Sequence, residues 1–282
     1  MVKALRTGNV WLFFLLTFII SWLVWAPLVG RPGGAQGALQ LVLLLGAFGP
    51  SIAGVIFIYA TQDADGRRDF WRRVFGFGRI DLPGWAIIVG LPLVYNGITL
   101  LFYWIITRSL PDFAFGAQML SAPGLLVSTL VVTFLAGPFS EELGWRGYAI
   151  DALLKDNTVV LASLILGVVW WAWHIPLFFI EGLIQYELGL FTLEHAGYIV
   201  STVSLSIHMT WLYLRTDRSI MAAILLHFTA NLVSQIVLVG ADLGPVWVVL
   251  TIVMNLIITA AIILLPGGLR TAQVTAVPAA SD

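Results

Sequence analysis

The chain is built from long apolar runs separated by short polar connections. Eight such runs stand out, and they cover Val10–Val29, Gly37–Ala60, Gly84–Thr107, Ala122–Leu154, Thr158–Ile180, Ala196–Leu214, Ile220–Val239 and Val246–Leu265. A helix of about 20 apolar residues spans the hydrocarbon core of a bilayer. The pattern therefore predicts an all-α, polytopic membrane protein with eight transmembrane helices. The fourth run is too long for one simple span, so its helix is either tilted or emerges beyond Arg146.

Composition narrows the function classes. The 282 residues are 60% hydrophobic and 10% charged, whereas soluble domains carry about 25% charged residues. The net charge is −1 and no basic patch is interleaved with aromatic residues, so we expect membrane lipid and no nucleic acid as a partner. The absence of cysteine excludes disulfides, thiolate catalysis and Cys-ligated zinc. A metal would have to use His, Glu, Asp or Asn.

The distribution of positive charge predicts the orientation. With a cytoplasmic N-terminus, Arg31 and Arg108 are the two of fourteen Lys and Arg residues that fall outside. Cytoplasmic loops are enriched in Lys and Arg, so both termini are expected in the cytoplasm. No repeat divides the chain, which predicts one membrane domain over residues 1–282 and a disordered tail over 266–282.

Residues 61–82 form a cytoplasmic segment in this topology. Arginines alternate there with Phe70, Trp71, Val74 and Phe75, which recur at helical spacing. This predicts a short amphipathic helix on the cytoplasmic leaflet. The alternative is a plain positively charged loop.

Two adjacent carboxylates and an arginine interrupt the fourth run. Charged groups inside a membrane segment are costly and commonly functional. Residues four apart share a helix face, so Glu142 is expected to pair with Arg146. Glu141 points about 100° away, has no cation of its own, and is a candidate general base. The alternative is a structural ion-pair cluster.

Further polar groups lie in other runs. His174 follows Trp170 by one turn in the fifth run, close to Pro176, and His227 and Asn231 lie four apart in the seventh. Either set alone also fits hydrogen bonding within the helix bundle. The remaining in-span polar residues are predicted to be structural: His208, Asn96, Gln235 and Asn255. His195 is placed in an outside loop without a role.

Together these side chains suggest a chemical site. Two carboxylates, two histidines and an asparagine on three spans must face the bundle interior rather than lipid. A carboxylate there could take a proton from water while His or Asn stabilises an oxyanion. One Glu with two His would also be a zinc-like ligand set with a position open for water. The HExxH signature is absent.

Three spaced motifs carry a resemblance to a known family. They are Glu141-Glu142-x-x-x-Arg146, an aromatic-x-x-x-His174 and His227-x-x-x-Asn231, within residues 120–240. This set resembles the type II CAAX protease and bacteriocin-processing family (CPBP, or Abi), eight-span intramembrane proteases related to CAAX prenyl protease 2. The second motif usually begins with Phe, whereas Trp170 stands here.

The resemblance implies an intramembrane endopeptidase that cleaves near the C-terminus of a membrane-anchored, CAAX-type protein or peptide. Glu141 is then similar to the general base, and His174 to the histidine that shares the attacking water or a metal. His227 and Asn231 resemble the pair that polarises the scissile carbonyl or ligates metal.

Glu142 and Arg146 resemble the pair that, in this family, orients the site or the terminus of the substrate. The resemblance also implies a multi-pass protein of the cell membrane whose site opens to the cytoplasm. It leaves two mechanisms open: a zinc enzyme with Glu141, His174, His227 and Asn231 as candidate ligands, or a metal-free, glutamate-dependent one. Two other functions remain open, a proton-coupled transporter and a non-catalytic immunity or scaffold protein of the same fold.

Overall fold

The computed structural model describes residues 9–239 and 243–269, and the regular elements within these ranges are all helices. Seven helical runs are long and apolar enough to cross a membrane: Val10–Leu28, Leu39–Thr61, Leu82–Thr107, Pro123–Leu153, Val159–Phe179, Ile220–Val237 and Gly244–Leu264. Each coincides with a predicted segment to within a few residues. The prediction of an all-helical chain is confirmed for the described residues, and the seven runs agree with a multi-pass membrane protein.

The predicted sixth span forms the 23-residue helix α13, Leu193–Arg215, which is not among those seven. An eighth span and the cytoplasmic termini therefore stay predictions. Residues 1–8 and most of the predicted tail, 270–282, lie outside the described residues. Within the described part of the tail, Pro266 and Gly267 are exposed, whereas Leu269 is buried and its N–H donates to the Ile262 carbonyl at 2.9 Å.

The helices follow the apolar runs in chain order. The first half contains α2 (Val10–Trp25), α3 (Leu39–Ala47), α4 (Gly49–Thr61), α5 (Ala64–Phe75), α6 (Leu82–Thr107), α7 (Ala114–Ser121) and α8 (Pro123–Phe134). The second half contains α9 (Ser140–Gly144), α10 (Ile150–Leu153), α11 (Val159–Trp173), α12 (Ile184–Leu188), α13, α14 (Ile220–Leu238) and α15 (Gly244–Leu264). The short helices α7 and α12 were not predicted.

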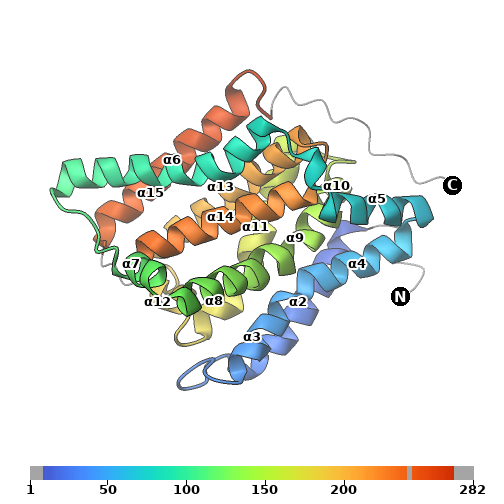
Figure 1. The fold of residues 1–282 in the computed structure, drawn as a ribbon. Coiled ribbons are helices and arrows are strands. Elements are labelled where there is room, and N and C mark those ends of the chain that lie inside the picture. The colour runs from blue at the N-terminus through green and yellow to red at the C-terminus, as the bar shows by residue number, and fades with distance from the viewer. Residues whose placement is uncertain (1–8, 240–242, 270–282) are drawn as a thin grey trace.

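Helix α14 lies at the centre of the bundle (Figure 1). It packs against α6 on one side and against α8 and α9 on another, while α11, α13 and α15 form a consecutive row of contacts. Helices α2 and α4 pack together, and α4 also covers α9. The segment that carries the carboxylates is therefore enclosed between α4 and α14.

The contact of α4 with α9 is a close approach of backbones. A Cβ on Gly144 would lie 2.1 Å from the Pro50 carbonyl oxygen, which no side chain could accept. Small residues allow such approaches between helices in membranes. Gly144 thus allows α4 to pack closely over one side of the carboxylate segment.

The fourth predicted segment is one helical run with two wider turns. Leu135–Phe139 and Trp145–Ala149 are π-turns on either side of α9. Pro138 lies in the first of them and has no N–H to donate, so a regular α-helical ladder cannot pass through it. Arg146 is fully buried, so the segment does not emerge into solvent at that residue. Single π-turns inside helices are frequent at functional sites.

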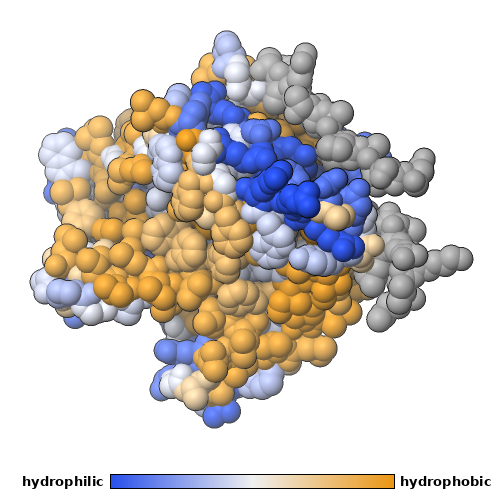
Figure 2. All heavy atoms as spheres, turned by 45° about the vertical axis from the view of Figure 1, so that its right-hand side comes forward, coloured by the Kyte–Doolittle hydropathy of each residue, from blue (hydrophilic) through white to orange (hydrophobic). Residues whose placement is uncertain are grey.

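Helix α5 confirms the amphipathic helix predicted within 61–82, and it is docked onto the bundle. Phe70 and Val74 are fully buried, whereas Phe75 is 59% exposed and stacks on Trp71. Trp71 is half-buried and packs against the same core, so three of the four apolar residues face the bundle and Phe75 does not. Figure 2 shows hydrophilic side chains gathered on the α5 side, above a broad hydrophobic surface.

A buried ionic network holds α5 against α10 and α13. Arg73 donates to Asp151 at 3.2 Å and to the Tyr213 hydroxyl at 2.7 Å, and Tyr213 donates to Asp151 at 2.9 Å. Arg218 also donates to Asp151. Burial by itself would lower the pKa of Arg218, but the neighbouring Tyr213 and Asp151 raise it. Both arginines therefore stay charged and share Asp151, while Arg73 also pairs with Asp69 at 2.8 Å.

Replacing Asp151 by Ala should destabilise the protein, because the buried Arg73 and the partly buried Arg218 would lose their shared carboxylate. Removing one partner of a buried ion pair costs about 3–5 kcal/mol of unfolding free energy. Thermal unfolding in detergent measures the change. The matched control is Asp65→Ala, whose pair with Arg68 is mostly exposed and should contribute about 1 kcal/mol or less. Equal effects of the two substitutions would contradict the role of the network.

Candidate active site

Glu142 has no exposed surface. Its Oε2 accepts from Arg146 Nη1 at 2.9 Å, which is the predicted pair four residues apart. Its Oε1 accepts from His227 Nδ1, also at 2.9 Å, across 85 residues of chain. The sequence did not indicate this second bond. Glu142 thus joins α9 to α14 as well as to the turn after it.

Arg146 is held from a third direction. Its Nη2 donates to the carbonyl and the hydroxyl of Ser206 on α13, at 3.2 and 3.1 Å. The Ser206 hydroxyl in turn donates to the Ser163 carbonyl on α11. The guanidinium also lies 5.5 Å from the Trp170 ring. The Glu142–Arg146 pair is therefore fixed in place by α11 and α13.

Glu141 points away from that pair and is 3% exposed. Its Oε2 accepts from the indole N–H of Trp145 at 3.3 Å and from that of Trp170. Glu141 takes part in none of the ion pairs between described residues. Both donors bind the same oxygen, Oε2, so the other carboxylate oxygen of Glu141, Oε1, is available to bind a ligand. Trp170, which replaces the usual Phe, supplies a hydrogen bond that Phe could not make.

His174 ends α11 instead of lying within it, and a 3₁₀ turn with Pro176 follows. Its Nδ1 bonds to the Trp170 carbonyl oxygen at 2.8 Å. Because a carbonyl only accepts, Nδ1 carries the hydrogen and Nε2 remains free for a ligand. The imidazole packs 4.7 Å from the Trp173 ring and 5.8 Å from that of Tyr198.

The predicted groups converge beside Gly137, in the first π-turn. A Cβ on this glycine would lie 3.3 Å from Asn231 Nδ2, 3.7 Å from Glu141 Oε1 and 3.7 Å from His227 Nε2. These three polar atoms therefore surround one point in space, at distances suited to a small molecule between them. Their side chains come from α9 and α14. His174 lies nearby, with its ring 5.9 Å from the Trp170 ring that also packs against His227 at 5.1 Å.

The remaining in-span polar residues have protein partners. Helices are bridged by the hydrogen bonds of His208 with Thr259 (3.0 Å), Gln235 with Thr133 (3.0 Å) and Asn255 with Tyr95 (2.9 Å). Asn96 instead donates within its own helix, to the Pro92 carbonyl at 2.9 Å. The structural prediction holds for these four residues.

His195 was predicted in a loop, and this was wrong. It lies in the first turn of α13, is buried, and accepts from the Trp171 indole at 3.2 Å. The site residues that the sequence analysis missed are Trp145 and Gly137. Trp145 follows Glu141 by four residues and so shares its helix face, a signal that was available. Gly137 gave no signal, because its position depends on the π-turn.

The two histidines among the predicted ligands share one feature with the histidines of known metal sites. Metal-binding histidines usually donate their second N–H to a carboxylate or carbonyl, as His227 and His174 do here. The described residues, however, contain no group of three or more His, Cys, Asp or Glu side chains close enough together to hold an ion. The predicted ligand set also contains Asn231, which is not one of those residue types, so the metal site stays a prediction and no chemical step is derived through a metal.

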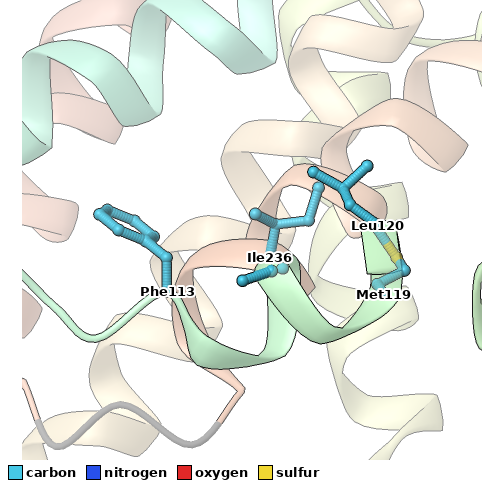
Figure 3. Close-up of a pocket in the computed structure, with 6 residues that line it drawn as sticks. Phe113, Met119, Leu120 and Ile236 are labelled. Atoms are coloured by element: carbon cyan, nitrogen blue, oxygen red, sulfur yellow. The ribbon is translucent and has the colours of Figure 1, made fainter. Parts of the chain in front are cut away.

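A separate apolar pocket of about 300 Å³ lies between α7 and α14 (Figure 3). It is lined by Phe113, Gly116, Ala117, Met119, Leu120 and Ile236. Ile236 is five residues beyond Asn231, or about 7.5 Å along the helix axis. The pocket has no polar side chain and cannot be the site of acid–base chemistry.

Comparison with known proteins gives two results. A family model described as "Type II CAAX prenyl endopeptidase Rce1-like" matches residues 123–233. CAAX prenyl protease 2 of Methanococcus maripaludis is 30% identical over 239 residues, which cover 82% of this chain and 86% of the relative. The family match contains all of the groups that converge near Gly137.

Because Glu142 and Arg146 form a buried ion pair, we predict that substitutions of the two residues have strongly coupled effects on the free energy of unfolding. Glu142→Ala would leave a buried guanidinium without its partner and should cost about 3–5 kcal/mol of unfolding free energy. The double variant Glu142→Ala/Arg146→Met should be less destabilised than the sum of the single variants, because no charge is stranded. Thermal unfolding of the four proteins measures this cycle. Additive effects would contradict the pairing.

Proposed function

Because the chain belongs to the Rce1-like family of type II CAAX prenyl endopeptidases, a family of membrane proteases, we propose that it hydrolyses a peptide bond near the C-terminus of a membrane-anchored, prenylated protein. The convergence of Glu141, His227 and Asn231 on one point beside Gly137 supports this assignment. A water molecule placed there would touch a carboxylate and two polar groups at once.

The buried charges suggest the working protonation state. The segment buries two carboxylates, Glu141 and Glu142, but one arginine, Arg146, and an unbalanced buried charge is costly. One additional proton balances the site. Since a general base must be ionised, this proton belongs on His227 in the reactive form. Its Nδ1–H then donates to Glu142, and its Nε2–H is directed toward the common point.

In the proposed reaction, Glu141 Oε1 takes a proton from the water, and the oxygen attacks the scissile carbonyl carbon. His227 and Asn231 donate hydrogen bonds to the oxyanion that forms, in a site from which bulk water is largely excluded. His174 accepts the second hydrogen of the water through Nε2. The protonated Glu141 then gives its proton to the leaving nitrogen as the carbon–nitrogen bond breaks.

The cellular setting is proposed from charge. Helix α5, which carries Arg73, and the turns that carry Arg79 and Arg218 meet at one end of the bundle, where Arg79 also bonds to Asp217. Clustered arginines favour the cytoplasmic side. We therefore assign that end to the cytoplasm of a cell membrane, with the site open to the same side.

Glu141→Gln should abolish cleavage of a prenylated CAAX peptide by the purified protein. The amide keeps the size of the side chain but cannot take a proton, and loss of a general base lowers kcat by about 10²–10⁴-fold. The control is Glu187→Gln, an exposed glutamate on α12. Unchanged cleavage by the Glu141 variant would remove this residue from the mechanism.

Chelation tests the metal-independent route, because the proposed steps use only water and side chains of the protein. Activity should survive treatment with EDTA or 1,10-phenanthroline, and elemental analysis of the active protein should find no stoichiometric zinc. If chelation abolishes activity and zinc restores it, the four predicted ligands, Glu141, His174, His227 and Asn231, must close around a metal in the working enzyme.

A further inference from the structure

Gly137 occupies an unusual place in the fourth helical segment. It lies in the π-turn Leu135–Phe139, and the side where its Cβ would stand faces α14. The residue is buried. Its backbone is held by Ser140, whose hydroxyl donates to the Gly137 carbonyl at 3.1 Å. The glycine is therefore fixed against the groups that the mechanism uses.

Three glycines of the fourth segment differ in what a side chain would meet. At Gly144 an added Cβ would collide with the Pro50 backbone at 2.1 Å, so glycine is needed there for packing. At Gly124 an added Cβ would meet nothing within 4 Å. At Gly137 the Cβ would meet polar side-chain atoms, none closer than 3.3 Å. A methyl group at 137 thus nearly fits, in contrast to one at 144.

The atoms beside Gly137 are hydrogen-bonding partners that a water needs. A buried water makes about three hydrogen bonds, and the nearest atoms to the Cβ position are an amide nitrogen, a carboxylate oxygen and an imidazole nitrogen. A Cβ in this position would compete with a water for the same space and would offer no hydrogen bonds to the three atoms.

We infer that Gly137 is a positioning residue for hydrolysis: its missing side chain leaves the space in which the attacking water is held between Glu141, His227 and Asn231. This inference rests on the proposed function. It assigns the glycine a role in the reaction and not in folding. The π-turn serves to bring the backbone at Gly137 to the edge of this space.

The test is Gly137→Ala, measured with a prenylated CAAX peptide in detergent. The variant should fold, because the closest contact of its methyl group is 3.3 Å, to a side-chain nitrogen. Its kcat should fall by about 100-fold or more, as expected when a reacting group is displaced by about 1 Å. KM should change little, since the space belongs to the water and not to the peptide.

Two matched variants make the result interpretable. Gly124→Ala, in the same helical segment with open space around it, should keep wild-type kcat and melting temperature. Gly144→Ala should lower the melting temperature because of its backbone clash. A Gly137→Ala protein that melts like Gly144→Ala would overturn the inference, because glycine would then be needed for packing. Full activity of Gly137→Ala would overturn it equally.

Glu141→Gln, assayed beside these variants, separates the inference from the proposed function. If Glu141→Gln is inactive while Gly137→Ala is fully active, the carboxylate keeps its role and only the position of the water is wrong. If Glu141→Gln is active, the proposed mechanism itself fails, whatever Gly137→Ala does.

Discussion

The site depends on one buried carboxylate with two partners. Glu142 has no contact with solvent and accepts from Arg146 and His227 at 2.9 Å each. A buried charge is stable only when it is paired and hydrogen-bonded, so both partners are fixed once the carboxylate is enclosed. The bond to Nδ1 sets the orientation of the His227 imidazole and directs Nε2 toward Gly137. The second carboxylate, Glu141, is left with neutral N–H donors.

The two adjacent glutamates have different partners because of helix geometry. Neighbouring residues point in directions about 100° apart, so one carboxylate can enter the ion pair while the other faces the indoles of Trp145 and Trp170. The two π-turns around α9 confine this arrangement to a short segment. Close packing of α4 at Gly144 encloses it from outside. The buried charged side chains of this site thus lie together, where three helices supply their hydrogen-bond partners.

Much of the fold could be predicted because transmembrane helices are specified locally. Apolar length gave the spans, and spacing of four residues gave the Glu142–Arg146 pair. The bond from His227 to Glu142 could not be foreseen, because its partners are 85 residues apart. Gly137 escaped notice because its role depends on a π-turn.

Other differences arise from tertiary contacts that the sequence does not encode locally. Pro176 marks a helix break, but only the structure shows that α11 ends at His174. Phe75 of α5 is exposed although its spacing is helical, because the buried network around Arg73 sets the rotation of that helix. His195 was misplaced because α13 begins earlier than its apolar run, at Leu193.

The central claim is that water, activated by Glu141, attacks the peptide directly. A single turnover in ¹⁸O-labelled water, with enzyme in excess over a prenylated peptide, tests this most directly by mass spectrometry. The account predicts one ¹⁸O atom in the new C-terminal carboxylate of the product and none in Glu141. An unlabelled product carboxylate after the first turnover, with ¹⁸O in the Glu141 side chain, would show covalent attack by the glutamate and contradict the account.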